Sequence, residues 1–274
     1  ILPENAEYRY NFLYDNCATR VRDAIENCLE GELIYGPRIG NLHSFRELVD
    51  HYQRVSPWTN FGIHLLLGSP TDINADLRNQ LFLPPYLELQ FAQSNVRRGD
   101  EISPLCQAQQ VIYQAPESPS ISFAQLHMPS ITMALLLLFY ALLTIKQRKQ
   151  HAIGYFFDYF WLLFNGIIGL ILTWFFFFSE LPAMQANYNL LWACPLNIGL
   201  ACIWMKKSWR NTLTSKLWLI PALMSMMFLA SSPLIPQAFP LPIYLIVFTS
   251  AMRSVFIYLK LRSLYHSTNT TQLS

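Results

Sequence analysis

The sequence predicts an α+β extracytoplasmic domain followed by an all-α membrane domain of about five transmembrane helices. Two observations on composition carry this prediction. The 274 residues are 53% hydrophobic and only 13% charged, whereas soluble domains are about a quarter charged. Charged residues concentrate in 1–112, while 129–260 is a series of long apolar runs separated by short basic clusters. The shortage of charge is therefore local, which indicates two domains of different kinds.

Five apolar segments in the second domain, 129–266, approach or exceed the length of about 20 residues that a spanning helix needs. They are residues 129–145, 154–178, 188–205, 217–235 and 241–259. The loops after the first, third and fifth segments (KQRKQH, KKSWRNTLTSK and KLRSLYH) are basic, whereas the other two contain no Lys or Arg. By the positive-inside rule, the basic loops face the cytoplasm. We therefore expect an integral membrane protein whose N-terminal domain lies outside the cytoplasm and whose tail at 267–274 is cytoplasmic. If the source is a Gram-negative bacterium, the spans lie in the inner membrane and the N-terminal domain is periplasmic.

Polar residues inside the predicted spans are candidates for special roles. Asp158 and Arg253 each lie near a cytoplasmic end, so they could form an ion pair between the second and fifth spans; alternatively, each side chain extends separately to the interface. Asn187, Asn189 and Asn197 lie in or beside the third span, where such side chains are costly unless they line a cavity or bond neighbouring helices. Both a lipid-headgroup site and helix–helix packing are compatible with these asparagines.

The N-terminal domain begins with alternating side chains over residues 8–15, a pattern typical of a half-buried strand. Asp15 or Asn16 can then cap a helix that begins near Cys17 and ends at Gly31. Ser44 and Glu47 have capping-box spacing, which predicts a second helix over 42–52. Residues 113–128 are rich in Ser and Pro and predict a linker into the first span.

Cys17 has two interpretations. A helix start favours an anion, and therefore a thiolate, and its free N–H groups could bind the oxyanion of an acyl-transfer intermediate. Asn16 and Arg20 would then be supporting residues, with Arg20 adding positive charge on the same side of the helix. Alternatively, Cys17 is a buried core residue in an apolar stripe with Val21, Ala24 and Cys28. The spacing is compatible with both a nucleophile and a core residue.

Other classes of site find little support. None of the five cysteines has metal-ligand spacing or forms a disulfide framework, so we expect neither a metal nor a cofactor. A net charge of +2 provides no footprint for nucleic acid as a partner. His43, His51 and His64 are possible bases for Cys17, although no spacing singles one out.

Several blocks of sequence carry a resemblance to a known family. They are, in order, YNFLYDNCATRVRD, SFRELVDHY, PWTNFGIHLLLGSPTD and LFLPPYLE, followed by NYNLLWACPL at 187–196. Together they resemble the family of the Lnb N-terminal periplasmic domain, and the block around Cys17 is the most specific. The resemblance covers nearly all of the chain.

The resemblance implies a Bacteroides-type lipoprotein N-acyltransferase with a permuted papain-like thiol-enzyme domain, only part of which lies in 1–112. Cys17 would be its nucleophile, and the histidine base would precede it. Because only 16 residues precede Cys17, the resemblance implies an N-terminally truncated chain that lacks this base. A membrane phospholipid would donate the acyl chain through a Cys17 thioester to the N-terminal amine of a lipoprotein. The alternatives are a membrane-anchored cysteine hydrolase (a phospholipase or peptidase) and a non-catalytic integral membrane scaffold.

Overall fold

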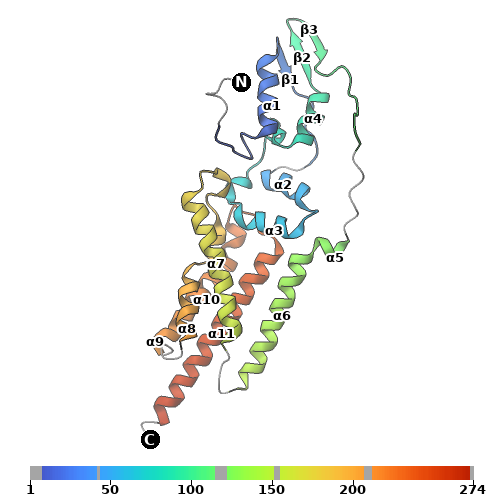
Figure 1. Ribbon diagram of the computed structural model, residues 1–274. Helices are drawn as coiled ribbons and strands as arrows, with labels where there is room; N and C mark the ends of the chain where they lie inside the picture. Colours follow the sequence, from blue (N-terminus) through green and yellow to red (C-terminus); the bar gives the residue numbers. More distant parts are fainter. Residues whose placement is uncertain (1–7, 42–43, 115–121, 151–154, 207–211, 272–274) are drawn as a thin grey trace. The chain divides into compact units, whose positions relative to one another are not determined.

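The computed structural model of the chain (Figure 1) describes residues 8–41, 44–114, 122–150, 155–206 and 212–271. These residues divide into two compact units. Ile1–Tyr52 and Thr71–Ser120 group in unit 1, and Gln53–Pro70 and Ile121–Ser274 group in unit 2. Unit 1 combines helices with a small sheet and unit 2 is helical, so the predicted fold class is confirmed. Residues 53–70 group with the spanning part, although they fall in the middle of the first predicted domain.

Unit 1 contains a three-stranded antiparallel sheet in the order β1-β2-β3, together with helices (Figure 1). The strands are β1 (Glu32–Ile34), β2 (Asn95–Arg98) and β3 (Glu101–Pro104), and the helices are α1 (Cys17–Cys28), α2 (Phe45–Gln53) and α4 (Pro84–Ala92). Gly31 lies between α1 and β1 with φ 138°, and a Cβ there would lie 2.5 Å from the Arg97 carbonyl oxygen. Glycine is therefore the residue that lets the chain leave the helix and pair at once with β2.

Two local predictions for unit 1 have different outcomes. The second helix has its capping box, because Glu47 N–H donates to Ser44 Oγ at 3.1 Å and Ser44 N–H donates to Glu47 Oε2 at 2.9 Å. The strand expected over 8–15 is wrong, since this segment folds back on itself. Asn11 and Asp15 exchange backbone hydrogen bonds of 3.0 and 2.8 Å. Asn11 Oδ1 also accepts from the backbone N–H groups of Leu13 and Tyr14, and such local bonds favour a turn over a strand.

Among its described residues, unit 2 has four helices that are long and apolar enough to cross a membrane. They are α6 (Met128–Arg148), α7 (Phe156–Phe178), α10 (Leu219–Ser231, within the candidate span Lys216–Leu234) and α11 (Leu241–Thr271). Large apolar side chains such as Leu135, Leu142 and Phe177 point outward and are exposed, as lipid-facing residues are. Of the predicted linker 113–128, residues 115–121 lie outside the described part, and Phe123–Leu126 form the short helix α5. α11 continues into the predicted tail 267–274, whose last residues, 272–274, also lie outside it.

The predicted third span, 188–205, is not one continuous helix. Two apolar helical pieces, Pro182–Leu191 and Leu196–Met205 (α8), meet at a bend of 42°. Pro195 lies at the break, where its ring removes a hydrogen-bond donor and disfavours helix at the preceding residue. α7 accommodates the irregular backbone through glycine, because a Cβ on Gly169 would lie 2.4 Å from the Ala193 carbonyl oxygen. The polar residues of this span therefore flank a break in the helix.

The segment 53–70 contributes helix α3 (Pro57–Leu66), which packs on the spanning helices. Phe61 of α3 is buried in one apolar cluster with residues of α6, α7, α10 and α11. The cluster also contains Trp192, from the break in the third span. The core of unit 2 thus includes a helix that precedes the spanning helices by about 60 residues in the chain.

Candidate active site

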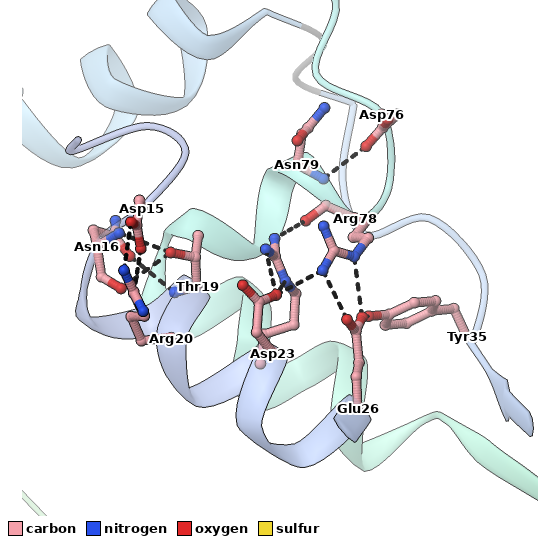
Figure 2. Close-up of polar contacts among 11 residues, drawn as sticks. Asp15, Asn16, Thr19, Arg20, Asp23, Glu26, Tyr35, Asp76, Arg78 and Asn79 are labelled. Carbon is pink, nitrogen blue, oxygen red and sulfur yellow. Dashed lines mark hydrogen bonds and ion pairs between the residues drawn. The ribbon is translucent and has the colours of Figure 1, made fainter. Parts of the chain in front are cut away.

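Cys17 is the first residue of α1. Asn16, which caps this helix, is shown in Figure 2. Asn16 Oδ1 accepts a hydrogen bond from Thr19 N–H at 2.9 Å, and Asn16 N–H donates to Thr19 Oγ1 at 2.7 Å. The Asn16 Nδ2 group donates to the carbonyls of Phe12 and Phe82 at 2.8 and 2.9 Å. Asn16 is 6% exposed, so its whole carboxamide serves to hold the start of the helix in place. This residue fixes the backbone from which the Cys17 side chain projects.

The face of α1 that carries Cys17 points outward. The residues of α1 that are buried are Ala18, Thr19 and Arg22. The residues of the predicted apolar stripe are all exposed: Cys17, Val21, Ala24 and Cys28. The interpretation of Cys17 as a core residue is therefore wrong. The stripe has helical spacing, but two of the three buried residues, Thr19 and Arg22, are polar, so hydrophobic periodicity does not detect the buried face.

Two backbone donors remain at the start of the helix. Thr19 N–H is bonded to the Asn16 side chain and Arg20 N–H to the Asn16 carbonyl. Within the described part of the chain, the N–H groups of Cys17 and Ala18 have no hydrogen-bond acceptor. Such free donors at a helix N-terminus stabilise negative charge. A thiolate on Cys17, or an oxyanion formed beside it, would lie next to them.

Arg20 bonds to Asp15, one residue before the cap. Its guanidinium forms an ion pair with the Asp15 carboxylate, with Nη2 2.7 Å from Oδ2, and both side chains are exposed. The guanidinium carbon also lies 4.3 Å from the centroid of the Tyr8 ring. The positive charge expected to act on Cys17 is thus matched by a carboxylate. An exposed pair of this kind has a small effect on its surroundings.

A charged network holds the inner face of α1 (Figure 2). Arg22, 3% exposed, donates from Nη1 to the Arg78 carbonyl at 3.0 Å. The Arg78 guanidinium in turn donates to Asp23 at 2.6 Å and to Glu26 at 2.7 Å, and the Tyr35 hydroxyl also donates to Glu26. Burial alone would raise the pKa of Glu26, but the hydrogen bonds from Arg78 and Tyr35 outweigh it and hold that pKa below its usual value. The ionised network therefore fixes the helix that carries Cys17.

The candidate histidine bases lie in different places. His51 is exposed on α2, with its ring 5.1 Å from the Tyr52 ring, and His64 belongs to α3 in unit 2. His43 lies outside the described residues. Among the residues that the structure describes, Cys17 has no hydrogen bond to a histidine. His51 and His64 therefore have no contact that marks either as the base.

The membrane-embedded charges meet within unit 2. Arg253 Nε and Nη2 donate to the two oxygens of Asp158 at 2.9 and 2.7 Å. Arg253 also donates to Thr144 Oγ1 at 2.7 Å and to Gln147 Oε1 at 2.9 Å. The two charged side chains are 1% and 2% exposed, so they do not extend separately to the interface. This cluster joins α6, α7 and α11.

The three asparagines of the broken span have different surroundings. The Nδ2 groups of Asn187 and Asn189 both donate to the Leu65 carbonyl at the end of α3, at 2.7 and 3.1 Å respectively. Asn197, in the first turn of α8, is 3% exposed, and within the described residues its Oδ1 has no partner. Two of the three side chains thus bond neighbouring protein segments. Lipid binding at these asparagines stays a prediction.

Comparison with known proteins identifies the family. Residues 121–264, more than half of the chain, match the family model of the Lnb transmembrane domain, and residues 1–50 match that of the Lnb N-terminal periplasmic domain. The chain belongs to the Lnb family. No curated protein and no solved structure matches it. The two Lnb matches agree with an integral protein of the inner membrane that has a periplasmic N-terminal domain.

The Lnb matches include the residues singled out above. Cys17 lies in the match to the Lnb periplasmic domain, and the broken span lies in the match to the Lnb transmembrane domain. Sequence reasoning did not find Arg78 or Gln237, which bond to α1 and to the broken span. Their partners are 52 and 50 residues away in the sequence, so no local spacing signals them.

Proposed function

We propose that this Lnb-family protein is a membrane-bound acyltransferase. It moves an acyl chain from a membrane phospholipid, through a thioester on Cys17, to the N-terminal amine of a lipoprotein. The observation that carries the proposal is the exposed Cys17 thiol at the first position of a helix, beside two backbone donors that have no acceptor among the described residues. It is supported by the spanning helices that follow Cys17 in the same chain, because both proposed substrates, a phospholipid and a lipoprotein, are held in the membrane.

The first step is attack by the Cys17 thiolate on the carbonyl carbon of a phospholipid ester. The S–C bond forms, the ester C–O bond breaks, and a lysophospholipid leaves after its alkoxide oxygen takes up a proton. The N–H groups of Cys17 and Ala18 are the proposed donors to the oxyanion of the tetrahedral intermediate. The thiol proton must pass to a base, and the described residues offer no histidine bonded to Cys17.

The second step is attack by the acceptor amine on the thioester. The N–C bond forms, the C–S bond breaks, and the amine loses a proton as the Cys17 thiolate is restored. A thioester suits this step because it is more reactive toward amines than the original ester. A membrane-facing site would also keep water from the thioester.

The charge pattern of the loops supports the side on which this chemistry takes place. The basic loops after α6, α8 and α11 are proposed to face the cytoplasm, together with the C-terminus. Unit 1 would then meet phospholipids of the outer leaflet and lipoproteins that have already been exported. A cysteine hydrolase would use the same thioester but release a free fatty acid, since water replaces the amine.

The experiment is to trap the thioester. The detergent-solubilised full-length protein is mixed with vesicles of a phospholipid whose acyl chain carries an alkyne, without acceptor. We expect a label on Cys17 that neutral hydroxylamine removes, and no label in Cys17→Ala. Cys28→Ala is the matched control, because Cys28 is an exposed free cysteine at the other end of the same helix and should leave the label unchanged.

Three results would count against the proposal. Equal labelling of wild type and Cys17→Ala would favour a scaffold over an enzyme. A label that is released as free fatty acid even when a diacylglyceryl peptide amine is present would favour the hydrolase. A label that depends on Cys28 would place the nucleophile elsewhere.

A further inference from the structure

The end of helix α3 is held by side chains from the spanning part of unit 2. The last carbonyls of a helix have no partner within the helix and need one from elsewhere. Asn187 Nδ2 donates to the carbonyls of Leu65 and Leu66 at 2.7 and 3.0 Å, and Asn189 Nδ2 donates to Leu65 at 3.1 Å. Gln237 Nε2 donates to the carbonyl of Leu67 at 3.3 Å. We call Asn187, Asn189 and Gln237 the carboxamide clamp.

The clamp is buried and braced by bonds among its own members. Asn187 Oδ1 accepts from Asn189 N–H at 3.0 Å and from Gln237 Nε2 at 3.5 Å. Gln237 Oε1 accepts from Tyr188 N–H at 2.9 Å, and Asn189 Oδ1 from Trp192 Nε1 at 3.0 Å. The three clamp residues are between 0% and 5% exposed. Because their donors and acceptors are both bonded, the carboxamide groups are held in the orientation in which they donate to the carbonyls at the end of α3.

The chain just after α3 is also bound. Gly68 N–H donates to the Ala183 carbonyl at 2.8 Å, and Ser69 N–H donates to the Ala186 carbonyl at 3.2 Å. A Cβ on Gly68 would lie 1.8 Å from the Gln185 carbonyl oxygen, so only glycine permits this approach. Residues 65–69 therefore lie directly against the first piece of the broken span.

The clamp also concerns unit 1, because the segment 53–70 lies between two stretches of unit 1 in the sequence. Residues 53–70 belong to unit 2, but unit 1 contains both the residues before them and the residues after them. The chain thus passes between the units at 52/53 and again at 70/71. These two points are the ends of the segment 53–70, which contains α3 and the carbonyls that the clamp holds. A further crossing runs through the Ser- and Pro-rich residues 113–128.

We propose that the carboxamide clamp is a positioning device for Cys17. It fixes α3 to the spanning helices, and the chain of unit 1 enters and leaves this held segment at 52/53 and 70/71. Restricting the attachment raises the effective concentration of the thiol at its lipid substrate. The inference rests on the proposed acyl transfer and explains what the asparagines of NYNLLWACPL do.

The test compares Asn187→Asp with Asn165→Asp in the full-length protein. The first variant keeps the size and the Oδ1 acceptor but loses both donated bonds. The matched control places the same new acid on α7, where Asn165 is 2% exposed and donates to the Trp161 carbonyl of its own helix at 2.8 Å. The milder Gln237→Met, which removes the bond to Leu67, is a second clamp variant in case the first fails to fold.

Three quantities are measured on each protein. For the clamp variants we expect about tenfold faster hydrogen exchange in peptides covering 63–70, because carbonyls at the end of α3 lose buried hydrogen bonds. Alkylation of Cys17 by a small water-soluble maleimide should be unchanged. Acyl labelling of Cys17 from alkyne-phospholipid vesicles should fall about tenfold. The Asn165→Asp control should resemble wild type in all three.

The outcomes separate this inference from the proposed function. Faster exchange with unchanged acyl labelling would overturn the positioning role while leaving acyl transfer intact. Unchanged exchange in a folded clamp variant would show that the clamp does not hold α3 and would also overturn it. An absence of acyl labelling in wild type would refute the proposed function instead, and the exchange rates would then decide alone whether the clamp holds α3.

Discussion

The ion pair of Asp158 and Arg253 allows a quantitative prediction for the membrane part. Arg253 donates four hydrogen bonds, two of them to Asp158 and one each to Thr144 and Gln147. Asp158→Ala removes the only carboxylate in the cluster and leaves a guanidinium that is 1% exposed beside two neutral acceptors. Removing one partner of a buried pair costs about 3–5 kcal/mol. We expect a loss of free energy of unfolding in that range.

The assay is reversible unfolding of the purified protein in mixed micelles of a mild detergent and dodecyl sulfate. The double variant Asp158→Leu/Arg253→Met should recover most of the loss, because no buried charge then lacks a partner. Glu32→Ala is the control, since its pair with Arg97 is exposed and should contribute at most about 1 kcal/mol. The reasoning is refuted if Asp158→Ala unfolds with wild-type stability, or if the double variant is no more stable than the single.

Three further predictions concern the helix that carries Cys17 and the packing of the broken span. Asn16→Ala should lower the stability of unit 1 by about 1–2 kcal/mol, measured by thermal unfolding, because it removes the cap of α1; Asn95→Ala, on β2, is a control away from the helix. The pKa of Glu26 is lowered in the folded protein, so its contribution to stability is present above its ordinary value of 4.5 and is lost as the pH falls through the lower folded value. Glu26→Gln should therefore flatten the acid side of the stability curve, and an unchanged curve would contradict the assignment. Gly169→Ala should lower the free energy of unfolding by about 1–3 kcal/mol, because the new Cβ would lie 2.4 Å from the Ala193 carbonyl oxygen. Gly199→Ala is the control and should not lower it, because a Cβ there would have nothing within 4 Å.

The sequence predicts the features that depend on composition and local chemistry. Apolar length locates the spanning helices α6, α7, α10 and α11. Capping chemistry locates the start of α1 at Cys17 and of α2 after Ser44. These features follow from residues that are neighbours along the chain.

Long-range bonding accounts for what the sequence does not predict. The outward direction of Cys17 depends on Arg22 and Arg78, which hold the opposite face of α1 to a segment 56 residues later. The grouping of residues 53–70 with the spanning helices depends on Asn187, whose partner Leu65 is 122 residues away. The turn at residues 11–15 is not predicted either, although its cause is local. The alternating side chains suggest a strand, whereas the Asn11 side chain closes a turn.

The most direct test of the central claim is the state of lipoprotein N-termini in cells that depend on this protein. The full-length gene is replaced by Cys17→Ala, with Cys28→Ala as the control, and N-terminal peptides of lipoproteins are analysed by mass spectrometry. Our account predicts diacylated peptides with a free α-amine for Cys17→Ala and fully N-acylated peptides for Cys28→Ala and wild type. Unchanged N-acylation in Cys17→Ala, with the variant present at wild-type levels in the membrane, would contradict it.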